Sequence, residues 1–349
     1  MLDKAECFLK VGIVGTGYSA KKRAEAIKAD RRAELLVVTG NTPERITKFC
    51  QDFAVKAVDS WSRLVNLPEL DLIFVCTINR DCGAIARAAI LAGKHVVVEY
   101  PLALEAQTAA EIIELAAAKQ KLLHIEHIEI IGGLHQAIKQ HLPRVGRVFQ
   151  VRYTTISRQK SDAFGYASAN RQSWKYHKST FGFPLAAALS RIHRLTDLFG
   201  AVKTVDCHNR YWDTAGSDYF RACMCNAQLH FENGTVGELI YGKGDIFHQS
   251  ERTFAIYGEQ GAIVFKGETG TLIQEGVEKK ITVTPRRGLF ARDTAMVLDY
   301  LCDRIAYPSG NRQPLYIQPQ ASLYALQVAN AAQKSSLRER KIYLSSELN

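Results

Sequence analysis

The stretch 123–129 (LHIEHIE) carries two histidines and two glutamates, side chains that proteins use as metal ligands and as acids or bases. In a strand, His124 and Glu126 would share one face, whereas His127 and Glu129 would share the other. Four ligands cannot converge from a single strand, so we predict no metal site. We predict instead that Glu126 is a catalytic group and that His127 is a substrate-contacting wall of the same cleft. A buried structural histidine is the alternative for His127.

Tyr100 and Asp293 are two further candidates for acid–base chemistry. Tyr100 follows an apolar stretch that ends at Glu99, which predicts a phenol at the carboxyl edge of a parallel sheet, where such sheets bind ligands. The ordinary phenol pKa of about 10 favours a positioning role over proton donation, and a packed aromatic ring is the alternative. Asp293 is either a residue near a helix N-terminus, where the dipole favours a carboxylate, or an acid in the cleft.

Arg191 and Arg194 are three residues apart, a spacing that within a helix would place both on one face. Guanidinium groups are well shaped to bind carboxylates. The spacing by itself favours a pair of surface arginines, and contact with an anionic ligand is the alternative.

The element that must position these side chains begins with the stretch 11–20 (VGIVGTGYSA). An apolar run ends in Gly15-x-Gly17-x-x-Ala20 and leads into a helix-forming segment. Gly15 would form the turn, Gly17 would allow close approach of a pyrophosphate, and Ala20 would let the helix pack on the strand. The pattern predicts a dinucleotide site, with a merely tight structural turn as the alternative.

The sugar end of the predicted site indicates NADPH, with NADH as the weaker alternative. Cofactors without a 2′-phosphate are usually held by an acidic residue at the tip of the second strand. This chain instead reads Gly40-Asn41-Thr42-Pro43-Glu44-Arg45, whose amide, hydroxyl and guanidinium suit a phosphate. The predicted cofactor contacts are Gly15, Thr16, Gly17, Tyr18, Ser19, Ala20, Gly40, Asn41, Thr42, Arg45, Thr77, Asn79, Glu99 and Tyr100.

The periodicity of the remaining chain predicts two domains. Short apolar strands at 33–39, 70–77, 94–99 and 122–131 alternate with helical segments, which is typical of a doubly wound parallel Rossmann sheet of the α/β class. From residue 146 onward, period-two stretches predict an open, mainly antiparallel sheet of the α+β class, closed by helices near 293–306 and 322–336. We therefore place an NADP-binding domain at 1–124, a substrate-binding domain at 125–349, and a flexible loop at 157–180.

The composition is that of a globular protein of 349 residues, of which 47% are hydrophobic, with a formal net charge of +10. Its basic residues are mixed with acidic ones, so we expect an anionic small molecule as partner and no nucleic acid. The sequence shows neither a signal peptide nor a run of about 18 apolar residues, so we expect no membrane association and a cytoplasmic location. The eight cysteines form no CxxC pair and are expected to be reduced. The oligomeric state is left open.

Three motifs resemble the glucose-fructose oxidoreductase and inositol dehydrogenase family: Gly15-Thr16-Gly17, the stretch 92–96 (AGKHV), and Glu99-Tyr100-Pro101. The resemblance covers nearly the whole chain and implies a Rossmann domain followed by an open sheet that covers the nicotinamide. Sugar dehydrogenases of the family carry a lysine where this chain has Tyr100. Their catalytic histidine and aspartate fall at Ser190 and His193, so the groups that oxidise polyols are absent from these positions.

Further motifs, in the same order along the chain, are similar to those of the biliverdin reductases, most closely the cyanobacterial members. They are the stretches 98–102 (VEYPL), 123–129 (LHIEHIE), 181–184 (FGFP), 190–191 (SR), 198–200 (LFG), 241–244 (YGKG) and 286–290 (RRGLF). The resemblance implies NADPH-dependent reduction of the C10 methine bridge of biliverdin to bilirubin. It also implies a catalytic, substrate-binding Arg191 and substrate contacts at Arg194 and Phe183. The alternatives are a sugar or cyclitol oxidoreductase and a non-catalytic nucleotide-sensing protein.

Overall fold

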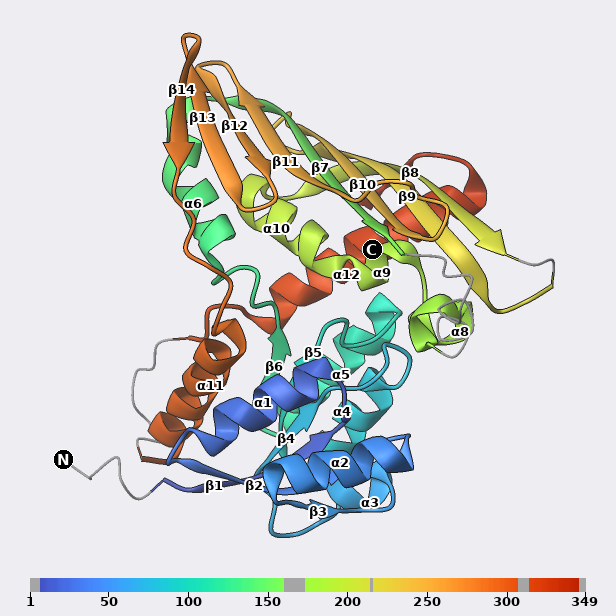
Figure 1. Cartoon of the computed structure of the whole chain (residues 1–349), viewed down its shortest axis with the longest axis vertical. Coiled ribbons are helices and arrows are strands. Elements are labelled where there is room, and N and C mark those ends of the chain that lie inside the picture. The colour runs from blue at the N-terminus through green and yellow to red at the C-terminus, as the bar shows by residue number, and fades with distance from the viewer. Residues whose placement is uncertain (1–6, 160–172, 214–215, 307–313, 345–349) are drawn as a thin grey trace. The chain divides into compact units, whose positions relative to one another are not determined.

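The computed structural model describes residues 7–159, 173–213, 216–306 and 314–344 (Figure 1). The chain forms two compact units, which are described separately. The first comprises residues up to 128 together with 287–323, and the second comprises 129–286 together with 324–349. The predicted division after residue 124 did not include the return of 287–323 to the first unit.

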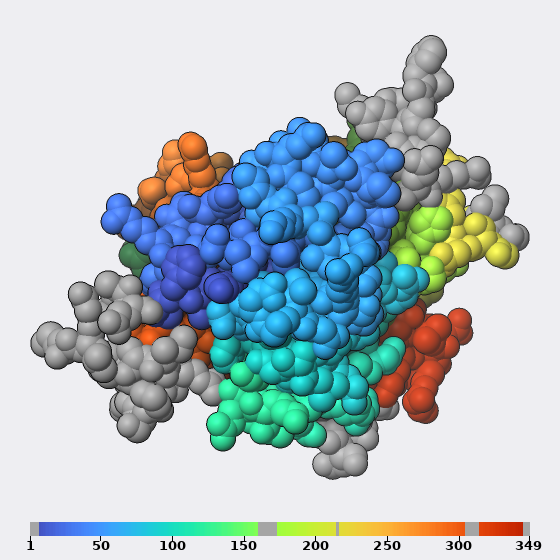
Figure 2. Space-filling view, turned by 90° about the horizontal axis from the view of Figure 1, so that it is seen from below, coloured from blue at the N-terminus to red at the C-terminus, as the bar shows by residue number. Residues whose placement is uncertain are grey.

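The first unit contains a six-stranded parallel sheet in the order β3-β2-β1-β4-β5-β6. Strands β1 and β4 pair along their central apolar residues, and β4 is buried throughout, as expected for a sheet covered on both faces. The predicted doubly wound Rossmann architecture is confirmed. Its elements are β1 (Leu9–Val14), α1 (Tyr18–Lys28), β2 (Ala33–Thr39), α2 (Pro43–Phe53), β3 (Lys56–Ala57), α3 (Trp61–Val65), β4 (Leu72–Val75), α4 (Cys82–Leu91), β5 (His95–Glu99), α5 (Ala106–Ala118) and β6 (Leu123–Glu126). Figure 2 shows one face of this unit, formed mainly by the blue and cyan residues early in the chain.

Helix α11 (Leu289–Ala306) joins the first unit because its apolar face completes that unit's core. Val297, Leu298 and Leu301 are fully buried in the cluster that includes the apolar residues of β1 and α1. The helix lies beside α1 (Figure 1). The predicted domain division placed 287–323 in the second domain. The packing of α11 explains why this segment belongs to the first unit instead.

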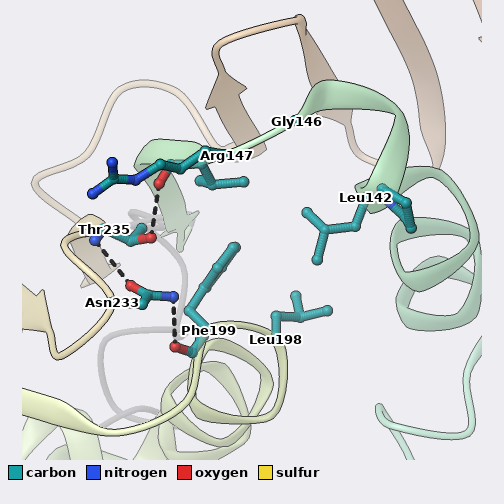
Figure 3. Close-up of a pocket in the computed structure, with 9 residues that line it drawn as sticks. Leu142, Gly146, Arg147, Leu198, Phe199, Asn233 and Thr235 are labelled. Atoms are coloured by element: carbon teal, nitrogen blue, oxygen red, sulfur yellow. Dashed lines mark hydrogen bonds between the residues drawn. The ribbon is translucent and has the colours of Figure 1, made fainter.

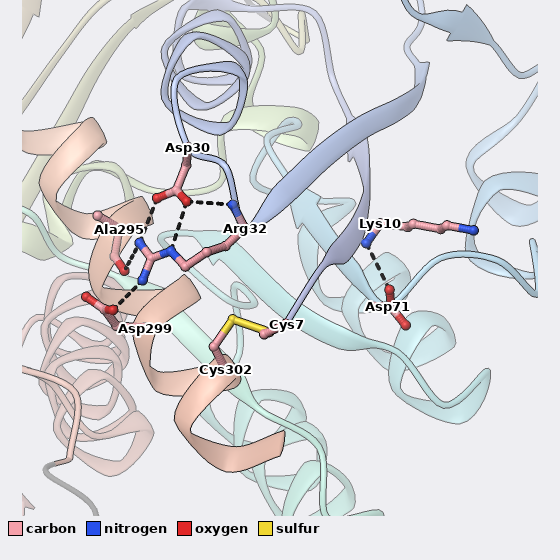
Figure 4. The surroundings of a disulfide bond; sticks show 8 residues. All are labelled: Cys7, Lys10, Asp30, Arg32, Asp71, Ala295, Asp299 and Cys302. Atoms are coloured by element: carbon pink, nitrogen blue, oxygen red, sulfur yellow. Dashed lines mark hydrogen bonds and ion pairs between the residues drawn. A yellow bond between two sulfur atoms is a disulfide. The ribbon is translucent and has the colours of Figure 1, made fainter. Parts of the chain in front are cut away.

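A disulfide between Cys7 and Cys302 fastens the start of the first unit to α11 (Figure 4). Nearby, Arg32 binds Asp30 and also the Asp299 carboxylate of α11. The expectation that all eight cysteines are reduced is therefore wrong for this pair, and the other six are free thiols. Since 295 residues separate the two partners, no local spacing in the sequence signals the bond.

The second unit contains a nine-stranded sheet in the order β14-β13-β12-β11-β7-β10-β9-β8-β15. Only β7 and β10 pair in parallel among these neighbours, so the predicted open, mainly antiparallel sheet is confirmed. The strands are β7 (Val148–Arg158), β8 (Val202–Asp213), β9 (Phe220–Phe231), β10 (Val236–Gly244), β11 (Glu251–Gly258), β12 (Gly261–Lys266), β13 (Thr269–Gln274), β14 (Val277–Ile281) and β15 (Ile342–Tyr343). The helices are α6 (Gly133–His141), η2 (Leu142–Val145), η3 (Trp174–Tyr176), α8 (Lys178–Phe181), α9 (Pro184–Ala187), α10 (Leu189–Phe199) and α12 (Pro319–Arg338), the last of which begins in the first unit.

Two local predictions differ from the structure. The strand predicted at 122–131 ends at Glu126, because the backbone N–H of Ile128 turns back to donate to the Glu126 carboxylate. The loop predicted at 157–180 begins inside β7 and ends in η3 and α8, and its central residues 160–172 lie outside the described residues. In the described ranges, no helix combines the length and apolar character needed to cross a membrane.

Candidate active site

The turn after β1 has the backbone geometry that a nucleotide site requires. Gly15 has a φ of +124°, which side-chain-bearing residues rarely adopt, and a Cβ there would lie 2.1 Å from the Cys76 carbonyl oxygen. Gly17 directly precedes α1, and no described atom lies within 4 Å of the position its Cβ would take. The first N–H groups of a helix have no partner within the helix and attract phosphate. Residues 15–20 can therefore hold a pyrophosphate.

A cavity of about 270 Å³ beside this turn is rich in cationic side chains. It is lined by Thr16, Gly17, Tyr18, Lys21, Arg45 and Lys48. Asp52 lies 3.5 Å from the Lys21 Nζ and 3.3 Å from the Lys48 Nζ, so two lysines share one carboxylate. The lining thus carries an excess of positive charge, which suits a phosphate dianion.

The other predicted cofactor contacts follow the carboxyl ends of neighbouring strands. Gly40 is close-packed, since a Cβ there would lie 3.1 Å from the Thr16 Cγ2 atom. Asn79 is buried after β4, and Glu99 ends β5. The remaining predicted contacts fall into four groups. Thr16, Tyr18, Ser19 and Ala20 lie between the first turn and α1; Asn41, Thr42 and Arg45 follow β2; Thr77 follows β4; and Tyr100 follows β5.

The ends of β5 and β6 bring three of the predicted catalytic or substrate-binding groups together. Glu99 and Glu126 are register partners in these strands. The rings of Tyr100 and His127 are stacked, with centroids 5.0 Å apart and planes 6° from parallel. Burial, and then the charge of Glu99, raise the pKa of Glu126 well above its ordinary value. This shift favours the protonated form of Glu126, at an edge where parallel sheets bind ligands.

Asp293 belongs to a buried charge cluster inside the first unit. Its Oδ2 atom pairs with Arg23, and its Oδ1 atom lies 2.8 Å from the His124 Nε2 and accepts the Tyr316 hydroxyl at 2.7 Å. Burial alone would raise the pKa of Asp293, but Arg23 and His124 outweigh burial and hold this pKa far below its ordinary value. Arg23 also binds Glu99 at 3.0 Å. Asp293 lies within α11 and is 0% exposed, and the structure shows it as a buried ion-pair partner rather than as a carboxylate of the first helical turn.

In the second unit, Arg191 lies on α10, half-buried. Its Nε donates to the Thr155 Oγ1 atom at 3.2 Å, and its guanidinium carbon lies 5.5 Å from the centre of the Tyr241 ring. Its Nη1 group also donates to the Ser190 Oγ atom at 3.5 Å. A guanidinium is planar and carries five N–H donors, a shape that suits a carboxylate or carbonyl. Phe183 lies at the start of α9 and is 7% exposed. Both residues remain predicted substrate contacts.

Arg194, one helical turn further along α10, is held by the protein itself. It is 1% exposed, donates to the Tyr153 hydroxyl at 2.7 Å, and pairs with the Glu129 carboxylate at 3.1 Å. Arg286 binds the same carboxylate. Burial would raise the pKa of Glu129, but the charges of Arg194 and Arg286 lower it. Arg194 is thus placed as a support of α10 rather than as an exposed clamp.

A second cavity, of about 350 Å³, lies in the second unit, and none of the predicted site residues lines it (Figure 3). Leu142, Leu198 and Phe199 line it with apolar surface. Its hydroxyl and amide groups are satisfied locally, since Thr235 donates to the Val148 carbonyl at 3.0 Å and Asn233 donates to the Phe199 carbonyl at 3.0 Å. In the part of the chain that the structure describes, no group of three or more His, Cys, Asp or Glu residues could hold a metal.

The sequence reasoning missed four residues that the structure adds to the site or its support: Lys21, Lys48, Arg23 and Tyr316. Lys48 follows Arg45 by three residues, a spacing that places both on one face of α2. This spacing could have identified Lys48 as a second cation near the phosphate. Arg23 and Tyr316 had no such signal, because their partners are distant in the sequence.

Comparison with known proteins places the chain in a family. The model of the oxidoreductase family with an NAD-binding Rossmann fold matches residues 9–127, and that of the C-terminal alpha/beta domain of the oxidoreductase family matches 139–344. The chain is similar to the crystal structure of biliverdin reductase from Synechocystis sp. PCC 6803 in complex with biliverdin and NADP+, with 50% identity and a TM-score of 0.87 over 94% of this chain and 98% of that one.

Two further relatives are more distant. Biliverdin reductase A of Mus musculus is 27% identical over 198 residues, which span 56% of this chain and 59% of that protein. An NAD binding oxidoreductase from Klebsiella pneumoniae is 17% identical, with a TM-score of 0.77 over 97% of this chain and 99% of that one, and supports the fold alone.

Proposed function

The chain belongs to the oxidoreductase family with an NAD-binding Rossmann fold, and we propose that within this family it reduces biliverdin to bilirubin with NADPH. The observation that carries the proposal is the 50% identity, over 94% of the chain, with a protein whose structure holds biliverdin and NADP+. Tyr100 supports it from the chain itself, since sugar dehydrogenases of the family have a lysine there.

The residues of the first unit fit NADPH. The turn at Gly15 has no room for a side chain, and the N-terminus of α1 is open for a pyrophosphate. Lys21, Arg45 and Lys48 offer positive charge where a 2′-phosphate is expected, and no acidic residue stands at the tip of β2 to repel it. When bound, NADPH supplies the hydride for the C10 methine bridge.

The reaction also needs a proton, because the electron pair displaced from the bridge moves to a pyrrole nitrogen. We assign the holding of this proton to Glu126, a buried carboxyl at the end of β6 whose raised pKa favours its protonated form. Tyr100, stacked on His127 beside it, shapes the same edge of the sheet. Asp293 has no part in the transfer, because both its oxygens bind other protein groups.

Arg191 is assigned to the substrate. A guanidinium is too weak an acid to release its own proton, so Arg191 binds and orients a propionate or lactam of the tetrapyrrole. Thr155 and Tyr241 hold its plane on one side. Phe183 offers apolar surface and Arg194 supports the helix.

The test is to mix the purified protein with biliverdin and NADPH and follow the absorbance of the green pigment and of the yellow product. Conversion that requires both reactants supports the proposal. Turnover of sugars or cyclitols with NADP+, and none of biliverdin, would favour the sugar-oxidoreductase alternative. Binding of NADPH without turnover of either class would favour a nucleotide sensor. We further propose a cytoplasmic location, because NADPH is supplied there; immunoblots of soluble and membrane fractions test it.

A further inference from the structure

Tyr316, just before α12, and Ser322, near the start of α12, bring two hydroxyl groups to a single residue, His127. The Tyr316 hydroxyl accepts the backbone N–H of His127 at 3.2 Å and donates to the Asp293 Oδ1 at 2.7 Å. The Ser322 hydroxyl lies 2.9 Å from the His127 Nε2. His127 is therefore fixed at its backbone and at the far side of its ring.

The ring held in this way is the one that stacks on Tyr100. The planes are 6° from parallel, and His127 is 0% exposed, so the imidazole has no freedom to turn without breaking its contacts. Tyr100 directly follows Glu99, the register partner of Glu126. The fixed His127 ring thus forms one wall against the Tyr100 phenol ring at the end of β5.

The support of Tyr316 reaches deep into the unit. Its acceptor Asp293 is anchored by Arg23 and His124, and the Tyr316 ring meets the His124 ring edge to face, with centroids 5.4 Å apart. The Tyr316 hydroxyl is therefore anchored through both its ring and its acceptor, and it meets the His127 backbone from this anchored position.

We propose that Tyr316 and Ser322 are positioning residues, which hold His127 and thereby orient Tyr100 for the reduction. The inference rests on the proposed function. The hydroxyls act through the Tyr100–His127 stack and do not touch the reacting atoms.

The first experiment compares two substitutions of the same kind. Tyr316→Phe removes the hydroxyl and keeps the ring. Tyr324→Phe is the matched control, because the Tyr324 hydroxyl also accepts a backbone N–H, that of Val202 at 2.7 Å, in the second unit. We expect kcat for biliverdin to fall about ten-fold in Tyr316→Phe and to change less than about two-fold in the control, with NADP+ affinity unchanged in both. Wild-type kcat in Tyr316→Phe would overturn the proposal.

A double-mutant cycle separates positioning from general destabilisation. In a Tyr100→Leu background, the ring to be oriented is gone, so Tyr316→Phe should lower kcat less than about two-fold. The same fractional loss in both backgrounds would show that Tyr316 does not act through Tyr100. If Tyr316→Phe does not fold, Ser322→Ala tests the same claim with a smaller change.

A crystal structure of Tyr316→Phe gives a readout that does not depend on turnover. The proposal predicts that the Tyr100 and His127 rings are no longer parallel, whereas an unchanged stack would contradict it. Absence of biliverdin turnover in the wild-type protein would instead count against the proposed function and leave this structural outcome to decide the positioning claim.

Discussion

Replacing Arg45 by alanine should weaken NADPH binding while leaving NADH binding nearly unchanged. Arg45 lines the 270 Å³ cavity beside the phosphate turn, together with Lys21 and Lys48. A hydrogen bond to a charged group contributes about 1.5 to 3 kcal/mol, which corresponds to a roughly ten- to hundred-fold higher Kd for NADPH. Lys48 is already paired with Asp52 at 3.3 Å, so Lys48→Ala should raise the Kd only a few-fold.

The assay is a titration of protein with NADPH and with NADH, followed by the fluorescence of the reduced nicotinamide. Arg63→Ala is the matched control, because Arg63 is an exposed arginine of α3 that pairs with Asp59. Its removal should leave both affinities unchanged. The NADPH affinity of the wild-type protein should also fall with added salt more steeply than its NADH affinity.

Two results would refute this reasoning. Equal loss of NADPH and NADH affinity in Arg45→Ala would mean that the arginine holds the shared part of the nucleotide. A wild-type protein that binds NADH more tightly than NADPH would mean that the cationic cavity does not select the 2′-phosphate.

Three further predictions concern the remaining charged groups. Arg191→Ala should lower kcat roughly thirty- to several-hundred-fold while the affinity for NADPH is retained, as measured by steady-state kinetics. Arg191→Lys should not restore kcat fully, because the ammonium group is a point charge and lacks the planar two-pronged contact of a guanidinium. Asp293→Asn should lower the free energy of unfolding by about 3 to 5 kcal/mol, since the buried Arg23 would lose its fully buried carboxylate partner and keep only Glu99, whereas the exposed Asp59→Asn should cost about 1 kcal/mol or less in urea melts. The hydrogen bond from His135 is the main cause that lowers the pKa of Asp197 to about 2, so this group stabilises the fold above pH 4 and loses that contribution as the pH falls toward 2. Asp197→Asn should remove about 1 kcal/mol of acid-sensitive stability, measured as the difference between unfolding free energies at the two pH values.

Local sequence patterns correctly predicted the elements whose structure depends on residues adjacent in the chain. The Gly15-to-Ala20 turn was predicted because it depends on adjacent residues, and its backbone matches the prediction. The helix carrying Arg191 and Arg194 was expected from the family resemblance and is α10. The spacing could not tell that Arg194 is buried against Glu129, because that partner lies 65 residues earlier in the chain.

Long-range pairing accounts for what the sequence did not predict. Asp293 meets Arg23, 270 residues away, and this ion pair, which no local pattern signals, joins α11 to α1 within the first unit. The raised pKa of Glu126 likewise needs the neighbouring strand, since Glu99 reaches it only through the pairing of β5 and β6. Tyr316 had no recognisable motif, because its role depends on a backbone N–H and a carboxylate that the fold brings together.

The position of the transferred hydrogen tests the central claim most directly. The protein should be incubated with biliverdin and NADPH that carries deuterium on the transferring face of nicotinamide C4, and the tetrapyrrole product analysed by proton NMR and mass spectrometry. The proposed hydride transfer predicts a bilirubin with one deuterium, located at C10. The other C10 hydrogen is the original methine hydrogen and stays protium. Product with deuterium at another carbon, or without deuterium, would contradict it.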